Sequence, residues 1–384
     1  MVAAVRKGET IYEVAKRFGV ARATVRRWVT RADGQRRDRV DWSDRRPGRR
    51  LPVNKTTPRL ESLILRVRKE LKDRSALGEY GAAAIHRDLL GRRLRDVPMV
   101  RTIGRILERR GALDGRPRVR RPPPPRGWYL PDVASGQVEL DSFDVIEGMH
   151  IKGQSAIEVF NGISLHGGLA ISWPYSAISA QTAASCLVEH WREVGLPAYA
   201  QFDNDTCFQG PHHHRDVVGR VMRTCLSLGV VPVFIPPRET GFQAAIEAYN
   251  GRWQAKVWAR FHYRSLRDLR ERSERYVAAS RHRAALRIEA APDRRPFPKR
   301  WRLDFQRPPL GRIVYLRRTS DRGTVSFLGR LFDVDPLWVH RLVRCEIDLC
   351  AQRIEFYALR RRESTWQPLL RKTVYHLPPR RFIE

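Results

Sequence analysis

The stretch "AYAQFDND", residues 198–205, places two acids directly after a run of residues typical of a strand. Asp203 and Asp205 flank Asn204, in a chain that carries 73 Lys and Arg residues against 41 Asp and Glu. Acid gathered at the end of a strand in so basic a protein suggests a metal site, because carboxylate oxygens are the ligands that Mg²⁺ prefers. Whether further acids reach this point depends on the elements around it.

Strand and helix patterns alternate on both sides of this stretch. Upstream, three successive strands suited to an antiparallel meander are predicted from "QVELDSFDVI", "SAIEVFNGIS" and "GGLAISWPYS". A helix follows each of the later segments: "SAQTAASCLVEHWREVGLP", then "HRDVVGRVMRTCLSLG" after the acidic strand, then "GFQAAIEAYNGRWQAKVWARF" after the strand "VVPVFIPP". This order predicts an α/β ribonuclease-H-like core with a mixed five-stranded sheet, over residues 133–290.

Three acids can meet at the strand ends of such a core. Asp141 lies in the first strand, Asp203 at the end of the fourth, and Glu247 on the last helix, away from its apolar stripe of Ile246 and Tyr249. Converging carboxylates repel one another unless cations lie between them, and two Mg²⁺ ions about 4 Å apart are the usual solution in phosphodiester chemistry. In the first strand the choice is open: Glu139 shares strand parity with Asp141, and Asp144 lies near the end. Asp141 is preferred.

These motifs carry a family resemblance. "ELDSFD", "QFDND" and "TGFQAAIEAYNGRWQAKVWARF", in this order behind helix-turn-helix patterns, resemble the three acidic motifs of DDE transposases of bacterial insertion sequences, which share the retroviral integrase core. The resemblance implies that Asp141, Asp203 and Glu247 are the catalytic triad and hold two Mg²⁺ ions, for which Mn²⁺ is expected to substitute. The residues expected to support them are Asn204, Asp205, Gln243 and Asn250. Many relatives have Gly where this chain has Asp205, which could support the metal or cap the next turn; the cap is preferred.

The activity implied is Mg²⁺-dependent cleavage and strand transfer of double-stranded DNA at the ends of a mobile element. Joining two ends in one event implies a homo-oligomer, at least a dimer. One alternative is a catalytically inactive DNA-binding repressor or architectural protein that uses the core for dimerisation. Another is a nuclease that cuts without joining, which tandem DNA-reading units disfavour.

The N-terminal region, residues 1–50, predicts a helix-turn-helix domain. In "ETIYEVAKRFGVARATVRRWVTRA", residues 9–32, Thr10 stands where an N-cap belongs and Gly19 ends the first helix. The second helix would then offer its polar side to the major groove of DNA. The residues on that side are Arg22, Thr24, Arg26 and Arg27. The alternative is an ordinary helical hairpin with a solvated basic face.

Residues 56–114 predict a second, winged-helix-like helix-turn-helix domain. Ile85 and Leu89 would face inward on one helix, with Pro98 in the first turn of the next. That next helix has the predicted buried stripe Val100, Ile103 and Leu107, and leaves Arg101, Thr102 and Arg105 outside for DNA. A helical spacer is the alternative, because the exposed face is poor in residues that read bases.

The remaining segments complete the expected architecture. Residues 115–132, "GRPRVRRPPPPRGWYLPD", predict a polyproline spacer, and short strands in residues 297–384 predict a small β-barrel similar to the SH3-like barrel behind many integrase cores. Arg252 and Lys256 could guide phosphates beside the acids, although surface ion pairing explains them equally well. His212–His214, near Cys207, are expected to form a surface loop, because zinc ligands are usually separated in sequence.

The charge balance points to the same partner. A formal net charge of +32 favours a polyanion, and no apolar run reaches the roughly eighteen residues needed to cross a bilayer. Nucleic acid is therefore the expected partner, without a membrane. Five scattered cysteines suggest neither a disulfide framework nor a zinc finger. With no signal peptide pattern at the start, a cytoplasmic, nucleoid-associated bacterial protein is expected.

Overall fold

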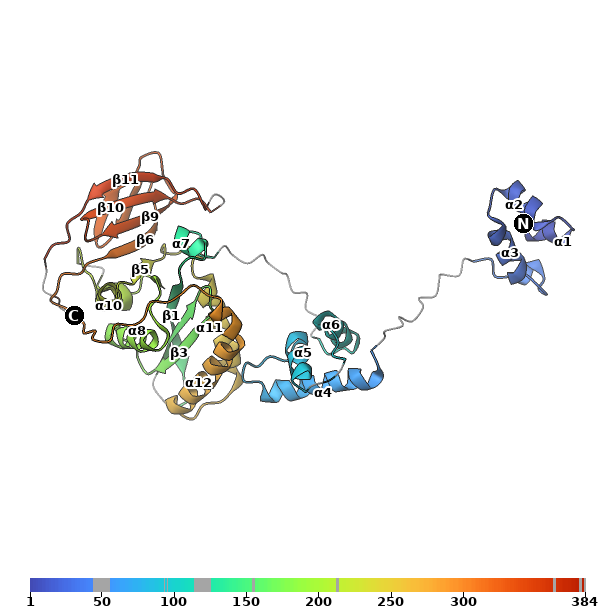
Figure 1. Ribbon diagram of the computed structural model, residues 1–384, viewed down its shortest axis with the longest axis horizontal. Helices are drawn as coiled ribbons and strands as arrows, with labels where there is room; N and C mark the ends of the chain where they lie inside the picture. The colour runs from blue at the N-terminus through green and yellow to red at the C-terminus, as the bar shows by residue number, and fades with distance from the viewer. Residues whose placement is uncertain are drawn as a thin grey trace. The chain divides into compact units, whose positions relative to one another are not determined.

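A computed structural model describes residues 1–43, 56–92, 94, 96–113, 126–153, 156–211, 214–361, 364–379 and 382. Two compact units make up the chain, Met1–Glu61 and Ser62–Glu384 (Figure 1). Residues 115–125 of the predicted spacer lie outside the described residues, as do His212 and His213.

The first unit begins with three helices, α1 (Val2–Arg6), α2 (Ile11–Phe18) and α3 (Arg22–Arg31), followed by the 3-10 turn η1 (Arg37–Arg39). Thr10 and Glu13 form a capping box at the start of α2, and Gly19 ends that helix with φ 63°, a conformation in which glycine is unstrained. Val14 and Val25 pack in a small core with Ala4 of α1. The helix pair is therefore completed by a short preceding helix.

Residues 56–113 contain α4 (Pro58–Arg74), α5 (Ala82–Gly91) and α6 (Val100–Arg109). The predicted inward residues Ile85, Leu89, Ile103 and Leu107 are all buried. Two details of the prediction for α6 are wrong. Val100 is 39% exposed and Ile106 is buried instead, while Pro98 precedes the N-cap residue Met99 rather than lying in the first turn. No wing strand is formed by the residues described in this segment.

The predicted core is built on five strands, β1 (Leu140–His150), β2 (Ala156–Ser164), β3 (Ala170–Tyr175), β4 (Tyr199–Phe202) and β5 (Val231–Phe234). Their order in the sheet is β3-β2-β1-β4-β5, with β1 to β3 antiparallel and β4 and β5 parallel to β1. This is the ribonuclease-H-like arrangement that the sequence predicts.

The sheet does not stop at five strands, and in this respect the prediction is wrong. It continues through β6 (Arg312–Arg318), β9 (Leu342–Asp348), β10 (Arg353–Ala358) and β11 (Leu369–Val374) to nine strands. The junction is a parallel pairing in which Phe234 of β5 lies beside Tyr315 of β6. A separate hairpin consists of β7 (Thr324–Phe327) and β8 (Arg330–Asp333). The described C-terminal strands thus extend the core sheet, and a separate barrel is not confirmed.

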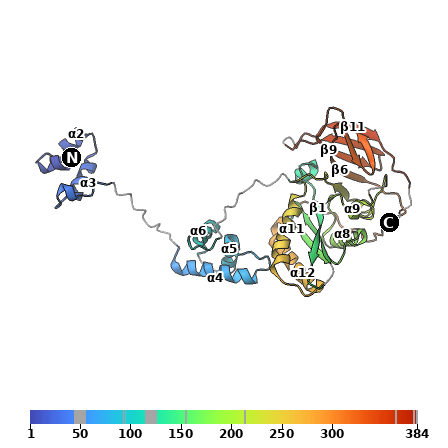
Figure 2. The same ribbon diagram turned by 180° about the vertical axis from the view of Figure 1, so that it is seen from behind.

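Helices cover both faces of the five-stranded part of the sheet (Figures 1 and 2). On one face lie α8 (Ala180–Val194) and α10 (Arg220–Ser227), and on the other α11 (Ala244–Lys256) and α12 (Leu266–Arg283). Shorter elements are α7 (Pro131–Ala134), α9 (Thr206–Gln209), η2 (Trp258–Arg260) and α13 (Ala285–Glu289).

Strand β1 shows which residue faces which helix layer. Phe143 packs with Trp191 of α8, whereas Ile146 belongs to the cluster of Ile246 and Trp253 of α11. Because successive side chains of a strand point to opposite faces, residues 141 and 143 face α8, and residues 144 and 146 face α11. This parity separates the two candidate aspartates of β1.

Candidate active site

Asp141 is enclosed on the α8 face of the sheet. It is 1% exposed, and Arg294 binds both of its oxygens, at 2.9 and 2.6 Å. The Trp191 indole donates to Oδ2 at 3.0 Å, and the imidazole of His190 lies 3.8 Å away. Burial alone would raise the pKa of Asp141, but the Arg294 guanidinium outweighs it and the pKa lies below its usual range. Asp141 is therefore not brought to the other two acids, and Asp144 replaces it as the candidate.

Asp144 lies beside Asp203 on the α11 face. The parallel pairing of β1 and β4 sets Ser142 opposite Gln201, so continuing the register by two residues brings the two aspartates level. Burial and the charges of Asp203 and Glu247 raise the pKa of Asp144 to about 6. Burial, with the charges of Asp205 and Glu147, also raises the pKa of Asp203. Neighbouring carboxylates whose charge is not neutralised by the protein favour binding of a cation.

Glu247 reaches this place from the first turn of α11, where it is exposed. Its helix is held to the sheet by the predicted stripe, in which Ile246, Tyr249 and Trp253 are all buried. One turn after Glu247, the Asn250 amide donates to Oδ2 of Asp144 at 2.6 Å. The helix and the strand that carry the acids are thus linked by a side-chain hydrogen bond.

The predicted supporting residues mainly hold the backbone around the acids. Asn204 donates to the carbonyl of Ile235 at 2.8 Å, which ties the end of β4 to that of β5. Asp205 is the N-cap of α9 and accepts from the amide of Cys207 at 2.7 Å, so the preferred cap interpretation is confirmed. Gln243 is the buried N-cap residue of α11.

Lys256 and Arg252 have protein partners. Lys256 donates to the carbonyl of Gly78 at 3.1 Å and lies 5.7 Å from the ring centroid of Tyr80. Arg252 is exposed and hydrogen-bonds the Tyr276 hydroxyl. The end of α11 therefore contacts the loop after α4, and the phosphate-guiding role of Arg252 and Lys256 stays a prediction.

The carboxylate oxygens of the three candidate acids are of the type that binds a hard divalent cation, but they do not lie at metal-binding distances from one another. Among the described residues, no three His, Cys, Asp or Glu side chains lie close enough to hold a metal ion. Cys207 and His214 are among the described residues, whereas His212 and His213 are not, and the surface loop expected for the three histidines stays a prediction. Asp144, within β1, and Asp203, directly after β4, nevertheless offer carboxylate oxygens on neighbouring strands, the type of ligand that Mg²⁺ binds.

Comparisons with known proteins add to this picture. Residues 1–37 match the model of a Homeodomain-like domain family, which agrees with the helix-turn-helix. No curated protein matches the chain. The catalytic core domain of BIV integrase is 14% identical with a TM-score of 0.28, covering 36% of this chain and 81% of that one.

Two further solved structures are similar. The HTLV-2 integrase catalytic core domain in complex with magnesium, in its dimeric form, is 12% identical with a TM-score of 0.27, over 35% of this chain and 81% of that chain. The simian T-cell lymphotropic virus intasome in complex with PP2A regulatory subunit B56 gamma is 12% identical, with a TM-score of 0.34. The match covers 69% of this chain and 88% of that chain.

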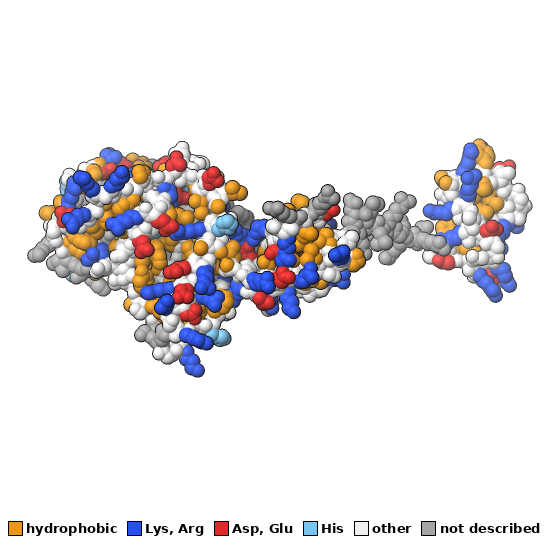
Figure 3. Space-filling model, turned by 60° about the horizontal axis from the view of Figure 1, so that its bottom comes forward, with side chains coloured by type: hydrophobic (Ala, Val, Ile, Leu, Met, Phe, Trp, Pro, Cys, Tyr) orange, Lys and Arg blue, Asp and Glu red, His pale blue; other side chains and the backbone are white. Residues whose placement is uncertain are grey.

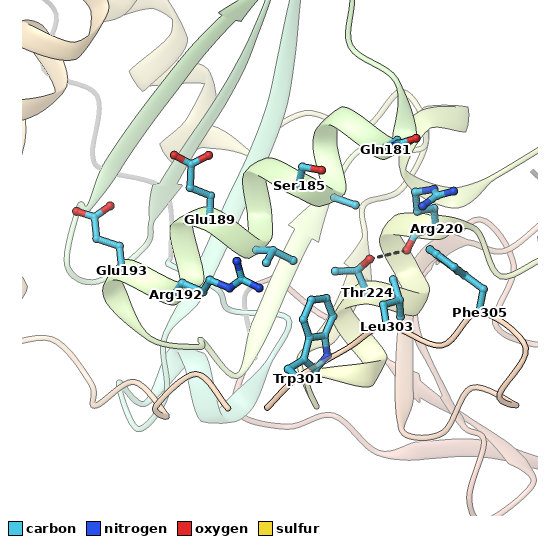
Figure 4. A pocket seen from close by; sticks show the side chains of 12 residues that line it. Gln181, Ser185, Glu189, Arg192, Glu193, Arg220, Thr224, Trp301, Leu303 and Phe305 are labelled. Carbon is cyan, nitrogen blue, oxygen red and sulfur yellow. Dashed lines mark hydrogen bonds between the residues drawn. The ribbon is translucent and has the colours of Figure 1, made fainter. Parts of the chain in front are cut away.

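A large groove lies on the opposite face of the sheet from the acids. It encloses about 770 Å³ between α8, α10 and the segment 301–305 (Figure 4). Glu189 and Arg192 of α8 and Trp301 line it, with Thr224 of α10 turned back to the carbonyl of Arg220 at 2.9 Å. The groove contains none of the three candidate acids, so its size does not make it the active site.

Proposed function

We propose that the protein is a DDE-type transposase that cuts and joins double-stranded DNA with a divalent cation. The observation that carries the proposal is the placement of Asp144, within β1, beside Asp203, directly after β4, in a ribonuclease-H-like sheet, with Glu247 acting on Asp144 from α11. A homeodomain-like domain in the same chain supports DNA as the substrate.

In this proposal Asp144, Asp203 and Glu247 hold two Mg²⁺ ions. When bound, the ions supply an activated water or 3′-hydroxyl and stabilise the oxygen that leaves. Asn250 fixes the Asp144 carboxylate through its hydrogen bond, and Asn204 holds the turn that contains Asp203. Fixed ligands reduce the reorganisation needed when DNA and metal arrive.

The proposed DNA contacts lie on two recognition helices. On α3, Arg22, Arg26 and Arg27 are exposed and Thr24 is partly exposed. On α6, Arg101 and Arg105 are exposed and Thr102 is partly exposed. Lys and Arg side chains are spread over the face drawn in Figure 3, which suits contacts with phosphates. Element ends and target DNA are the proposed partners, bound by a homo-oligomer that is at least a dimer.

The setting proposed for this activity is a bacterial insertion sequence, with the protein in the cytoplasm at the nucleoid. None of the helices among the described residues is long and apolar enough to span a membrane.

A catalytically inactive DNA-binding protein is the second candidate function. The observation in its favour is that the described acids do not form a group of three at metal-binding distances. Such a protein would bind terminal repeats but would not nick DNA at any concentration of Mg²⁺ or Mn²⁺.

The test is cleavage and strand transfer on DNA that carries the terminal repeats flanking the gene. Asp144→Asn and Asp203→Asn keep the side-chain shape and remove a charged ligand, so we expect cleavage to fall about a thousandfold, as several kcal/mol of lost metal stabilisation imply. The matched control is Asp205→Asn, which preserves the cap of α9 and should still cut. DNA binding without cleavage by the unaltered protein would favour the second candidate, and an active Asp144→Asn would exclude Asp144 as a ligand.

A further inference from the structure

Asn161 is a fully buried amide on the face of the sheet that α11 covers. It lies on β2 with no exposed surface, between Val159 and Ile163, which pack in the same cluster as α11. In the antiparallel pairing of β1 and β2, Asn161 is directly opposite Asp144. A polar side chain at such a position is expected to make hydrogen bonds that compensate for its lost contacts with water.

Asn161 makes one such bond, and it leads to the acids. Its Nδ2 donates to Oδ1 of Asn250 at 2.8 Å, and Nδ2 of Asn250 donates to Oδ2 of Asp144 at 2.6 Å. An asparagine amide has an accepting oxygen on one side and a donating nitrogen on the other. Because Asn161 engages the oxygen of Asn250, the nitrogen of Asn250 is the group that faces Asp144.

The reversed amide would be unfavourable at both ends. The oxygen of the reversed Asn250 amide would face the carboxylate of Asp144, so two acceptors would meet. Its nitrogen would face the nitrogen of Asn161, so two donors would meet. With the nitrogen of Asn161 directed at its oxygen, Asn250 is thus favoured in the orientation in which it donates to Asp144.

The second atom of the Asn161 amide supports the same interpretation. Its Oδ1 has no hydrogen-bond partner among the described residues. A buried acceptor without a partner costs stability, which an apolar side chain of similar shape would avoid. The donor is thus the group of Asn161 that this position uses, and it is directed at Asn250.

We propose that Asn161 is a positioning residue of the metal site: by fixing the amide of Asn250, it holds the Asp144 carboxylate in the orientation that binds a divalent cation. This inference rests on the proposed function, because it requires Asp144 to be a metal ligand. Asn161 itself touches neither metal nor DNA, and it acts only through Asn250.

The test measures Mn²⁺ and Mg²⁺ affinity of the full chain by calorimetry, without DNA. Asn161→Leu keeps the approximate shape and removes the donor, and we expect Mn²⁺ affinity to fall about tenfold or more, as for residues that orient metal ligands. Asn250→Leu should cause a loss of similar or greater size. In the double variant the loss should equal that of Asn250→Leu alone, because residues in one chain of hydrogen bonds are not additive.

Ser172→Ala is the matched control. The Ser172 hydroxyl hydrogen-bonds the hydroxyl of Tyr249 at 2.7 Å, so it also holds α11 to the same face of the sheet, but it does not contact Asp144. This variant should unfold at a lower temperature and keep its Mn²⁺ affinity. If Asn161→Leu does not fold, Asn161→Ser replaces it, since the shorter hydroxyl does not reach Asn250.

The outcomes separate this inference from the proposed function. Unchanged Mn²⁺ affinity in a folded Asn161 variant, or additive losses in the double variant, would overturn the role of Asn161 while leaving the metal site intact. If the unaltered protein binds neither cation, or Asp144→Asn binds as tightly as the unaltered protein, the proposed function fails and the role of Asn161 fails with it.

Discussion

At the scale of single residues, two aspartates of one strand have opposite environments. Asp141 is paired with Arg294 under α8, whereas Asp144 faces Asp203 and Glu247 under α11. Their separation of three positions places them on opposite faces of the sheet. The buried carboxylate of Asp141 forms a structural ion pair with Arg294. The half-buried carboxylate of Asp144 lies among other acids, and no protein cation neutralises its charge among the contacts described.

Asp144→Asn should stabilise the protein when divalent cations are removed with EDTA. The pKa of Asp144 is raised from 3.8 to about 6, so the folded state holds this proton more tightly than the unfolded state, and stability is lost as pH rises through this range. Above pH 6 the whole penalty applies, on the order of 3 kcal/mol at about 1.36 kcal/mol per pKa unit, and below about pH 4 it vanishes. Denaturant unfolding at pH 7 and pH 4 measures the gain in free energy of unfolding caused by Asp144→Asn. An equal gain at both pH values would contradict the raised pKa of Asp144.

At the scale of elements, β6 is joined to the turn that carries Asp203. Arg317 of β6 is 7% exposed and donates to the side-chain oxygen of Asn204 at 2.9 Å and to the carbonyl of Ile235 at 2.9 Å. A third bond reaches the carbonyl of Ser326 at 3.1 Å. Burial lowers the pKa of Arg317. A strand beyond the predicted core thereby holds the end of β4.

Arg317→Lys and Arg317→Met should both lower the free energy of unfolding, by about 1–3 kcal/mol, since neither can serve three separated acceptors. Because Asn204 loses a donor, cleavage should fall as well, and the lysine variant should not rescue it. Denaturant unfolding and the cleavage assay provide the two measurements. Full activity of Arg317→Lys would show that positive charge alone suffices there.

At the scale of the whole molecule, the nine-stranded sheet makes the C-terminal strands part of the core. Tyr315, Cys345 and Phe356 of these strands belong to the same buried cluster as Phe202 and Phe234 of β4 and β5. The predicted boundary between residues 290 and 297 therefore divides one hydrophobic core, whereas Met1–Glu61 is a separate unit.

Truncation tests this difference directly. A fragment of residues 1–290 should be insoluble or unfolded, because it exposes the edge of β5 and the apolar surface that β6 and β9 cover. A fragment of residues 56–384, which lacks the first helix-turn-helix, should keep the cooperative unfolding transition of the core. Thermal unfolding and solubility of the two fragments are compared; a cooperatively folded 1–290 fragment would refute the single core.

Much of the local structure follows from short patterns in the chain. Thr10 and Gly19 bound α2, Asp205 caps α9, and the stripe of Ile246, Tyr249 and Trp253 buries α11, because caps and periodicity act over a few residues. Asn161 is not among the predicted residues, although the pattern shows a polar residue at the inward position between Val159 and Ile163.

Patterns in the chain are enough to predict the order of strands and helices in the core. They also place Asp203 directly after a strand and Glu247 on the polar side of a helix. Three features come from the packing of the whole chain: α11 covers the face of Asp144, Asn161 reaches Asn250, and β6 pairs with β5. Periodicity is a local property, whereas the choice of face and of strand partner depends on contacts between residues far apart in the chain.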